Sequence, residues 1–135
     1  MPGAPIEALR SVSLFGDLDD GELSQVALLF KLRRFSAGDT VVKEGADGAA
    51  FFLIESGEAK VSVHGVERAG LAAGDHFGEI ALIDEGVRSA TISATTDLVC
   101  YGLTLWEFRP LVIENGNIGW KLLHSLAKKL RTAES

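Results

Sequence analysis

The sequence has one cysteine, three prolines and no long uninterrupted apolar run. A lone cysteine, Cys100, leaves no intramolecular disulfide to form, which favours a reducing compartment. No apolar stretch approaches the ~18 residues of a membrane span, and the first residues lack the basic-then-apolar order of a signal peptide. We therefore expect a cytoplasmic domain with no membrane span.

Basic side chains are scarce as well. Thirteen Lys and Arg stand against 19 Asp and Glu, which gives a formal net charge of −6. Non-specific nucleic-acid binding needs many cations to neutralise phosphates, so no direct contact with nucleic acid is expected. The cations near the end of the chain are interpreted as a solvated helix face. Any anionic partner must therefore be small and held by local positive charge.

The length of 135 residues suits one domain with its own hydrophobic core. Fifteen glycines punctuate runs of β-branched and aromatic residues, above all in the middle third. This pattern is typical of an antiparallel β-barrel or jelly roll. Residues 51–54 are apolar on both faces and should run through the interior. The expected strands are 30–35, 40–43, 50–55, 59–64, 67–71, 89–94 and 98–104.

Helices are predicted on both sides of this β-rich block. Asp19 with Glu22, and Thr104 with Glu107, have the spacing of capping boxes. We therefore expect one helix over residues 20–30 and another that begins at Thr104. The single domain, residues 1–135, divides into an N-terminal helical part (1–30), a β-barrel (30–104) and two C-terminal helices (104–135).

The last helix should be amphipathic and capped by Asn117. Large aromatic side chains, Trp106, Phe108 and Trp120, are expected to anchor the two C-terminal helices in the core. Apolar residues recur every four positions along one face of the last helix: Ile118, Leu122, Leu126 and Leu130.

One segment departs from the pattern of strands and turns. Gly78 frees the backbone, and residues 79–83 have helix-forming composition but suffice only for a very short helix. The first N–H groups of such a turn lack internal partners and attract an anion. Arg88 can return beside them, and its planar guanidinium grips two phosphate oxygens at once.

A carboxylate, Glu79, lies at the same place and would repel a phosphate. The carboxylate must therefore bind a part of the ligand other than the phosphate. A ribose hydroxyl fits, because an ionised carboxylate can only accept hydrogen bonds and a hydroxyl can donate one. Amides and a guanidinium for phosphate, with a carboxylate for sugar, form a recognition set for a small nucleotide.

Residues 77–83, Phe-Gly-Glu-Ile-Ala-Leu-Ile, are followed after four residues by Arg-Ser-Ala-Thr at 88–91. Together, residues 77–91 resemble the phosphate-binding cassette of the cyclic-nucleotide-binding domain family. That family includes the protein kinase A regulatory subunit, the catabolite activator protein and cyclic-nucleotide-gated channels. The glycine turns at 43–48 and 54–61 and the lead-in at 71–75 also match, so the resemblance covers nearly the whole chain.

The resemblance implies a non-catalytic receptor whose C-terminal helices move when it binds cAMP or, as the less favoured ligand, cGMP. Hydrophobic residues behind the cassette, Leu82 and Ile83, would pass the movement on. By resemblance, Glu79 would accept from the ribose 2′-OH, and Arg88 would neutralise the cyclic phosphate. The other implied contacts are the amides around Gly78, Ile80 and Ala81 for the phosphate, Ser89 for the phosphate or base edge, Val61 and Leu71 for the base, and Arg131 as a candidate base cap.

Three departures from the family pattern bear on affinity and on the base. Val87 stands where many members have proline, which should loosen the loop. Asp84 and Glu85 add negative charge near the anion site. Ser89 leaves the base open, because threonine at this position goes with guanine in the family and alanine with adenine.

Other interpretations remain open at this stage. Glu79 and Arg88 could form an ordinary ion pair. The same fold could be an empty module for docking or dimerisation, or the sensory piece of a longer effector, with an effector protein or a second copy as partner. A metal enzyme of the cupin type is disfavoured because His64, His76 and His124 are scattered singly. The chain offers no activated nucleophile, so no catalytic residues are expected.

Overall fold

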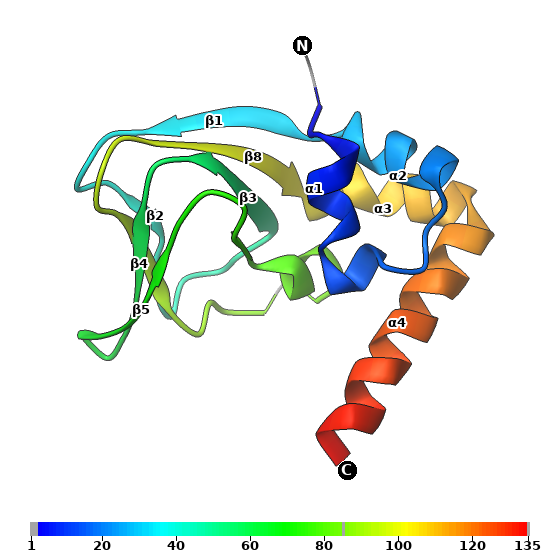
Figure 1. Cartoon of the computed structure of the whole chain (residues 1–135). Helices are drawn as coiled ribbons and strands as arrows, with labels where there is room; N and C mark the ends of the chain where they lie inside the picture. The colour runs from blue at the N-terminus through cyan, green and yellow to red at the C-terminus, as the bar shows by residue number, and fades with distance from the viewer. Residues whose placement is uncertain (1–2, 85, 135) are drawn as a thin grey trace.

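The computed structural model describes residues 3–84 and 86–134, with the strands gathered at one end of the molecule and most of the helices at the other (Figure 1). In chain order the elements are α1 (Ile6–Arg10), η1 (Ser13–Phe15), α2 (Asp20–Ala27), β1 (Lys31–Phe35), β2 (Thr40–Val42), β3 (Ala50–Ser56), β4 (Ala59–Val63), β5 (Val66–Leu71), β6 (His76–Phe77), η2 (Glu79–Leu82), β7 (Thr91–Ala94), β8 (Leu98–Thr104), α3 (Leu105–Glu114) and α4 (Gly116–Glu134).

The strands form two four-stranded antiparallel sheets, ordered β1-β8-β3-β6 and β2-β7-β4-β5. The predicted mainly-β architecture of the jelly-roll type is therefore confirmed, although the two sheets do not close into one barrel. Strand β6 was not predicted, because two residues are too short to show alternation. It pairs with β3 through His76 opposite Leu53 and Phe77 opposite Phe52.

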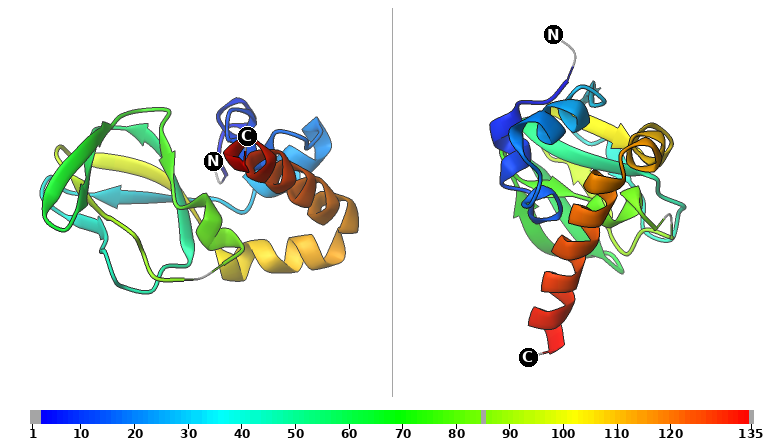
Figure 2. Two further views of the ribbon diagram at one scale, coloured as in Figure 1. Left: turned by 90° about the horizontal axis from the view of Figure 1, so that it is seen from below. Right: turned by 90° about the vertical axis from the view of Figure 1, so that its right-hand side faces the viewer.

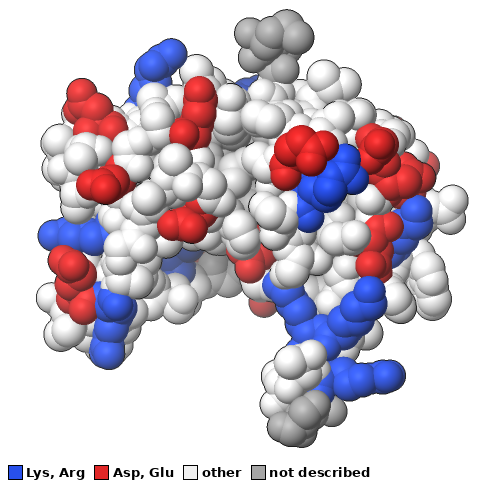
Figure 3. All heavy atoms as spheres, in the orientation of Figure 1, with Lys and Arg blue, Asp and Glu red and all other residues white. Residues whose placement is uncertain are grey.

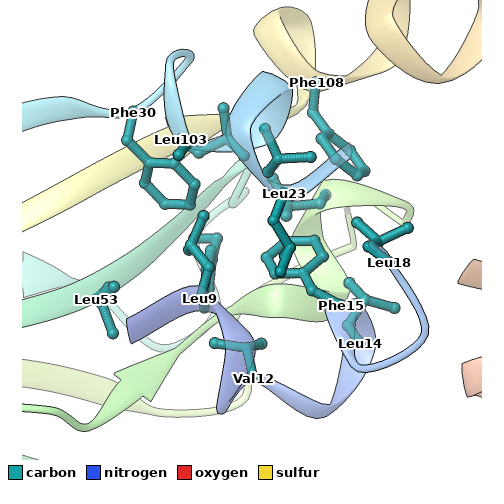
Figure 4. Close-up of a cluster of buried hydrophobic side chains, with 14 of the residues drawn as sticks. Leu9, Val12, Leu14, Phe15, Leu18, Leu23, Phe30, Leu53, Leu103 and Phe108 are labelled. Carbon is teal, nitrogen blue, oxygen red and sulfur yellow. The ribbon is translucent and has the colours of Figure 1, made fainter. Parts of the chain in front are cut away.

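Strand β3 joins two hydrophobic clusters because its side chains alternate between its faces. Phe51 and Leu53 belong to the cluster that packs under the helices, part of which Figure 4 shows. Phe52 and Ile54 belong to the cluster of the sheets. All four side chains are buried, as the doubly apolar run predicts.

The N-terminal part contains more helix than the sequence indicated, because α1 and η1 precede α2. Asp19 and Glu22 form the predicted capping box. Helix α2 ends at Ala27 rather than at Phe30, because the chain tightens into a turn. The Phe30 amide donates to the carbonyl of Ala27 (3.3 Å), and β1 starts at the next residue.

The two C-terminal helices meet at a single residue, Asn115. The capping box of Thr104 and Glu107 starts α3 as predicted. Asn117 does not cap α4, because α4 already begins at Gly116 and the Ile118 amide donates to the carbonyl of Asn115 (3.0 Å).

The prediction that three aromatic side chains anchor the C-terminal helices in the core is wrong for two of them. Phe108 is buried, but Trp106 and Trp120 are 62% and 72% exposed. Both tryptophans lie on the outer faces of their helices, where sequence spacing alone could not separate core from surface.

Helix α4 packs against the core through its first half and its middle, and its C-terminal end projects away from the body of the molecule (Figure 2). Ile118 and Leu122 are buried, whereas Leu130 is 62% exposed. Polar contacts hold the middle of α4 to the N-terminal part: His124 and Lys128 both contact Asp17, at 2.5 and 2.9 Å. None of the helices in the described residues combines the length and apolar character that crossing a bilayer requires.

Candidate functional site

Six of the predicted binding residues line one cavity beside the cassette. The cavity has a volume of about 400 Å³ and lies between η2 and the segment that leads into β7. The strand expected over residues 89–94 starts only at Thr91. The residues just before it are therefore irregular. Glu85 lies outside the described residues. The lining consists of Gly78, Glu79, Ile80, Ala81, Asp84, Gly86, Val87, Arg88 and Ser89.

Gly78 turns the chain into η2 with a φ of +86°, a left-handed conformation that favours glycine. A Cβ at this position would lie 2.8 Å from the carbonyl oxygen of Ala50 and 2.6 Å from Nη1 of Arg88. The turn closes through the Ala81 amide, which donates to the carbonyl of Gly78 (3.0 Å). Within the described chain, the amide of Ile80 finds no hydrogen-bond acceptor. The Ile80 amide is thus the better placed of these donors for an anion.

Arg88 is held by its backbone and projects a charged side chain into the cavity. Its amide donates to the carbonyl of Ala46 and its carbonyl accepts from the amide of Gly45, both at 2.8 Å, so the first glycine turn fixes its position. Nη2 donates to the carbonyl of Ala50 at 2.5 Å. Burial lowers the pKa of Arg88, but a guanidinium stays protonated in proteins.

Glu79 pairs with two cationic or donor groups, neither of which is Arg88. Its Oε2 lies 3.3 Å from Nδ1 of His76, and its Oε1 lies 3.8 Å from Nζ of Lys129 on α4. The contact with His76 lowers the pKa of Glu79 most, burial opposes it, and Lys129 lowers it further. The alternative of an ion pair between Glu79 and Arg88 is therefore wrong: among the described carboxylates none pairs with Arg88.

The remaining predicted residues are placed differently. Val61 and Leu71 lie on β4 and β5, partly buried against the cluster of the sheets, and do not line the cavity. Ser89 is exposed at the cavity wall. Arg131 is exposed on α4, outside the cavity lining.

Two residues at the site, His76 and Lys129, were missed by sequence reasoning. His76 stands three residues before Glu79, a spacing that by itself suggests a metal site rather than a contact with this carboxylate. The sequence pattern places Lys129 on a solvated helix face, and only the fold brings α4 to the cassette. No group of three His, Cys, Asp or Glu side chains that could hold a metal ion occurs among the described residues.

A family model for the cyclic nucleotide-binding domain matches residues 32–115. The chain is 39% identical over 92 residues to a cAMP-dependent protein kinase regulatory subunit of Emericella nidulans, an alignment that covers 67% of this chain and 22% of that protein. The chain spans about a quarter or less of the length of the curated relatives it matches.

Solved structures agree with this match. The N-terminal domain of a transcriptional regulator from Streptomyces coelicolor superposes with a TM-score of 0.86 at 25% identity, covering 94% of this chain and 92% of the other. The regulatory domain of Toxoplasma gondii PKA, crystallised with cAMP, superposes with a TM-score of 0.69 at 30% identity, covering 78% and 42%. The family predicted from the cassette is confirmed: the chain belongs to the cyclic nucleotide-binding domain family.

Proposed function

We propose that this chain is a non-catalytic receptor domain for a cyclic nucleotide, with cAMP favoured over cGMP. The observation that carries the proposal is the state of Arg88. Its guanidinium lines the cavity and is partly buried, yet no described carboxylate neutralises it. Its hydrogen bond to the Ala50 carbonyl does not balance the charge, and a partly desolvated charge without a counter-charge is unfavourable unless a ligand supplies one.

The phosphate is assigned to Arg88 and the start of η2. A cyclic phosphodiester carries one negative charge, which one guanidinium can balance. Of the five N–H groups of Arg88, the hydrogen bond to the Ala50 carbonyl uses one and leaves the fork available to phosphate oxygens. The Ile80 amide adds a donor at the same wall, and Gly78 lets the backbone approach closely.

The sugar and base are assigned to the residues around the phosphate position. Glu79 is kept ionised by its neighbours and can accept a hydrogen bond from the ribose 2′-OH. Ser89 is exposed where it could contact the phosphate or the edge of the base. Val61 and Leu71 lie outside the cavity, so a base that contacts them must extend from the cavity along the sheet.

Binding without turnover is favoured by the chemistry of the chain's one thiol. Cys100 is buried between the sheets, and burial raises the pKa of its thiol to about 11. The thiolate is the reactive form of cysteine, so Cys100 is not a nucleophile near neutral pH. The polar side chains that line the cavity, those of Glu79, Asp84, Arg88 and Ser89, are suited to binding charged groups and hydroxyl groups.

We also propose that ligand binding moves α4. Lys129 reaches the carboxylate that the sugar hydroxyl would use, so helix and ligand compete for Glu79. The C-terminal half of α4 has little apolar packing, as the 62% exposure of Leu130 shows. A ligand that binds one arrangement of α4 more tightly shifts its population by that difference in affinity.

Calorimetric titration tests the proposal. The wild-type protein should bind cAMP saturably, and cGMP should compete more weakly. Linear 5′-AMP serves as a control for a general affinity for nucleotides. Absence of heat and of a thermal shift at millimolar cAMP and cGMP would instead support the empty module that docks or dimerises.

The signal of a bound nucleotide needs a recipient, which we propose to be an effector protein or a second copy of the chain. The exposed apolar residues of α4, Trp120, Leu123 and Leu130, are available for such a contact. Light scattering with and without cAMP separates the two recipients, because only dimerisation changes the mass of the purified protein.

A further inference from the structure

His76 occupies a restricted place between β3 and the cavity. It belongs to β6, where it pairs with Leu53 of β3. Its ring meets that of Phe51 edge to face, with centroids 5.6 Å apart. Nδ1 is buried and has no hydrogen-bond partner in the described structure, but Oε2 of Glu79 lies 3.3 Å away. The nearest polar group to this buried nitrogen is thus a carboxylate oxygen that approaches without full hydrogen-bond geometry.

The chemistry of the pair fixes the location of a proton. An ionised carboxylate can only accept, so a favourable contact requires Nδ1 to carry hydrogen. A buried N–H without an acceptor is costly, and Glu79 is the acceptor within reach. Strand pairing and the contact with Phe51 hold the imidazole, so the carboxylate, at the end of a longer side chain, adjusts to it.

The two oxygens of Glu79 consequently have different surroundings. Oε2 faces His76, while Oε1 faces Lys129 on the less firmly packed half of α4. A ligand hydroxyl can replace the 3.8 Å contact with Lys129 more easily than it can displace a ring that packs against Phe51. Oε1 is therefore the oxygen that remains for a ligand.

We propose that His76 is a positioning residue, which holds Oε2 of Glu79 so that Oε1 is presented to the 2′-hydroxyl of the bound sugar. This inference rests on the proposed function. It assigns to His76 a share of the discrimination between ribose and deoxyribose, although His76 itself makes no contact with the ligand. The imidazole also offsets part of the repulsion between the carboxylate and a nearby phosphate.

The test compares the affinities of cAMP and 2′-deoxy-cAMP, because a general structural defect weakens both ligands alike. His76→Phe keeps a ring against Phe51 but removes the donor, and should reduce the ratio of the two affinities about five- to tenfold by weakening cAMP alone. His76→Asn places an amide N–H near the position of Nδ1 and should keep the ratio close to that of the wild type. His76→Gln extends its donor past that position and should behave like His76→Phe, which keeps the test valid if the phenylalanine variant folds poorly.

Two controls separate the possible failures. His64→Phe changes a histidine that is exposed and contacts Glu44 instead, and should leave the ratio unchanged. In Glu79→Gln, a further His76→Phe change should have no added effect on the ratio. If wild-type protein binds no cyclic nucleotide, the proposed function is rejected and this role with it. If it binds but the ratio is the same in the wild type, His76→Phe and His76→Gln, or if both ligands weaken equally, only the role of His76 is overturned.

Discussion

Gly48 makes room for the side chain of Arg88. A Cβ built on Gly48 would lie 2.0 Å from Nε of Arg88 and 2.5 Å from its Cδ. On the other side, a Cβ on Gly78 would lie 2.6 Å from Nη1. The Arg88 side chain thus lies in a slot lined by two glycines, and this space together with the hydrogen bond to Ala50 sets its direction. Figure 3 shows that other cations on the visible surface lie among acidic groups, except where several gather toward the C-terminal end of α4.

Gly48→Ala should weaken cAMP binding about tenfold or more, because the new methyl group pushes the Arg88 side chain out of its slot. The atoms in the way belong to a flexible side chain, so stability should change little. Gly70→Ala is the matched control, since a Cβ there meets nothing within 4 Å. Calorimetry and thermal unfolding of both variants check this, and an unchanged affinity in Gly48→Ala would mean that the direction of Arg88 is not important.

Arg88→Ala should lower the affinity for cAMP by about 1.5–3 kcal/mol, the range for a hydrogen bond to a charged group. The ligand-free protein should not lose stability, because the change removes a desolvated charge that lacks a described carboxylate partner. Urea unfolding without ligand measures the second effect. A large loss of stability would show that the guanidinium has a structural role, and an unchanged affinity would remove it from the site.

Lys129→Ala should reduce the response of α4 to the ligand, because it removes the contact between the helix and Glu79. Trp120, 72% exposed on the same helix, reports that response by fluorescence once Trp106 is replaced by phenylalanine. We expect cAMP to change the Trp120 emission in the parent protein and to change it less in the Lys129→Ala variant.

The control for this experiment is Lys60→Ala on β4, which removes the same charge away from α4. It should leave the fluorescence response intact. Equal responses in the Lys129 and Lys60 variants would argue that α4 senses the ligand by another route, such as the packing of Leu82.

The pH dependence of stability should reveal the ionised state of Glu79. Contact with His76 lowers its pKa in the folded protein below the ordinary 4.5. A carboxyl group with a depressed folded pKa stabilises the protein above its unfolded pKa, and this contribution disappears as the pH falls through the folded value. The difference in unfolding free energy between wild type and Glu79→Gln should therefore not decline from pH 7 to pH 5, and should decline below about 4.5. A decline already above pH 5 would contradict this.

Much of the fold could be predicted because local signals agree with the tertiary structure. The capping boxes at Asp19 and Thr104 mark real helix starts, and the doubly apolar run at 51–54 is a central strand. Shorter elements, such as β6 and η1, could not be predicted, because two or three residues carry no periodicity. The exposure of Trp120 could not be predicted either, since it depends on which face of α4 meets the N-terminal part.

The site could be predicted in composition but not in its internal contacts. Motif spacing brought Gly78, Glu79 and Arg88 together, and they line one cavity. Spacing could not show that Glu79 pairs with Lys129, fifty residues later in the chain, because that contact depends on how α4 leaves α3. Nor could it show the slot at Gly48, which only the path of the Arg88 side chain reveals.

The most direct measurement is a crystal structure of the protein grown with cAMP. We expect the cyclic phosphate to lie within hydrogen-bond distance of the Arg88 guanidinium and the Ile80 amide. The ribose 2′-OH should contact Glu79, with Lys129 displaced from that carboxylate. A structure in which side chains or solvent alone fill this cavity at saturating cAMP, or in which the nucleotide binds elsewhere, would contradict the proposed binding site.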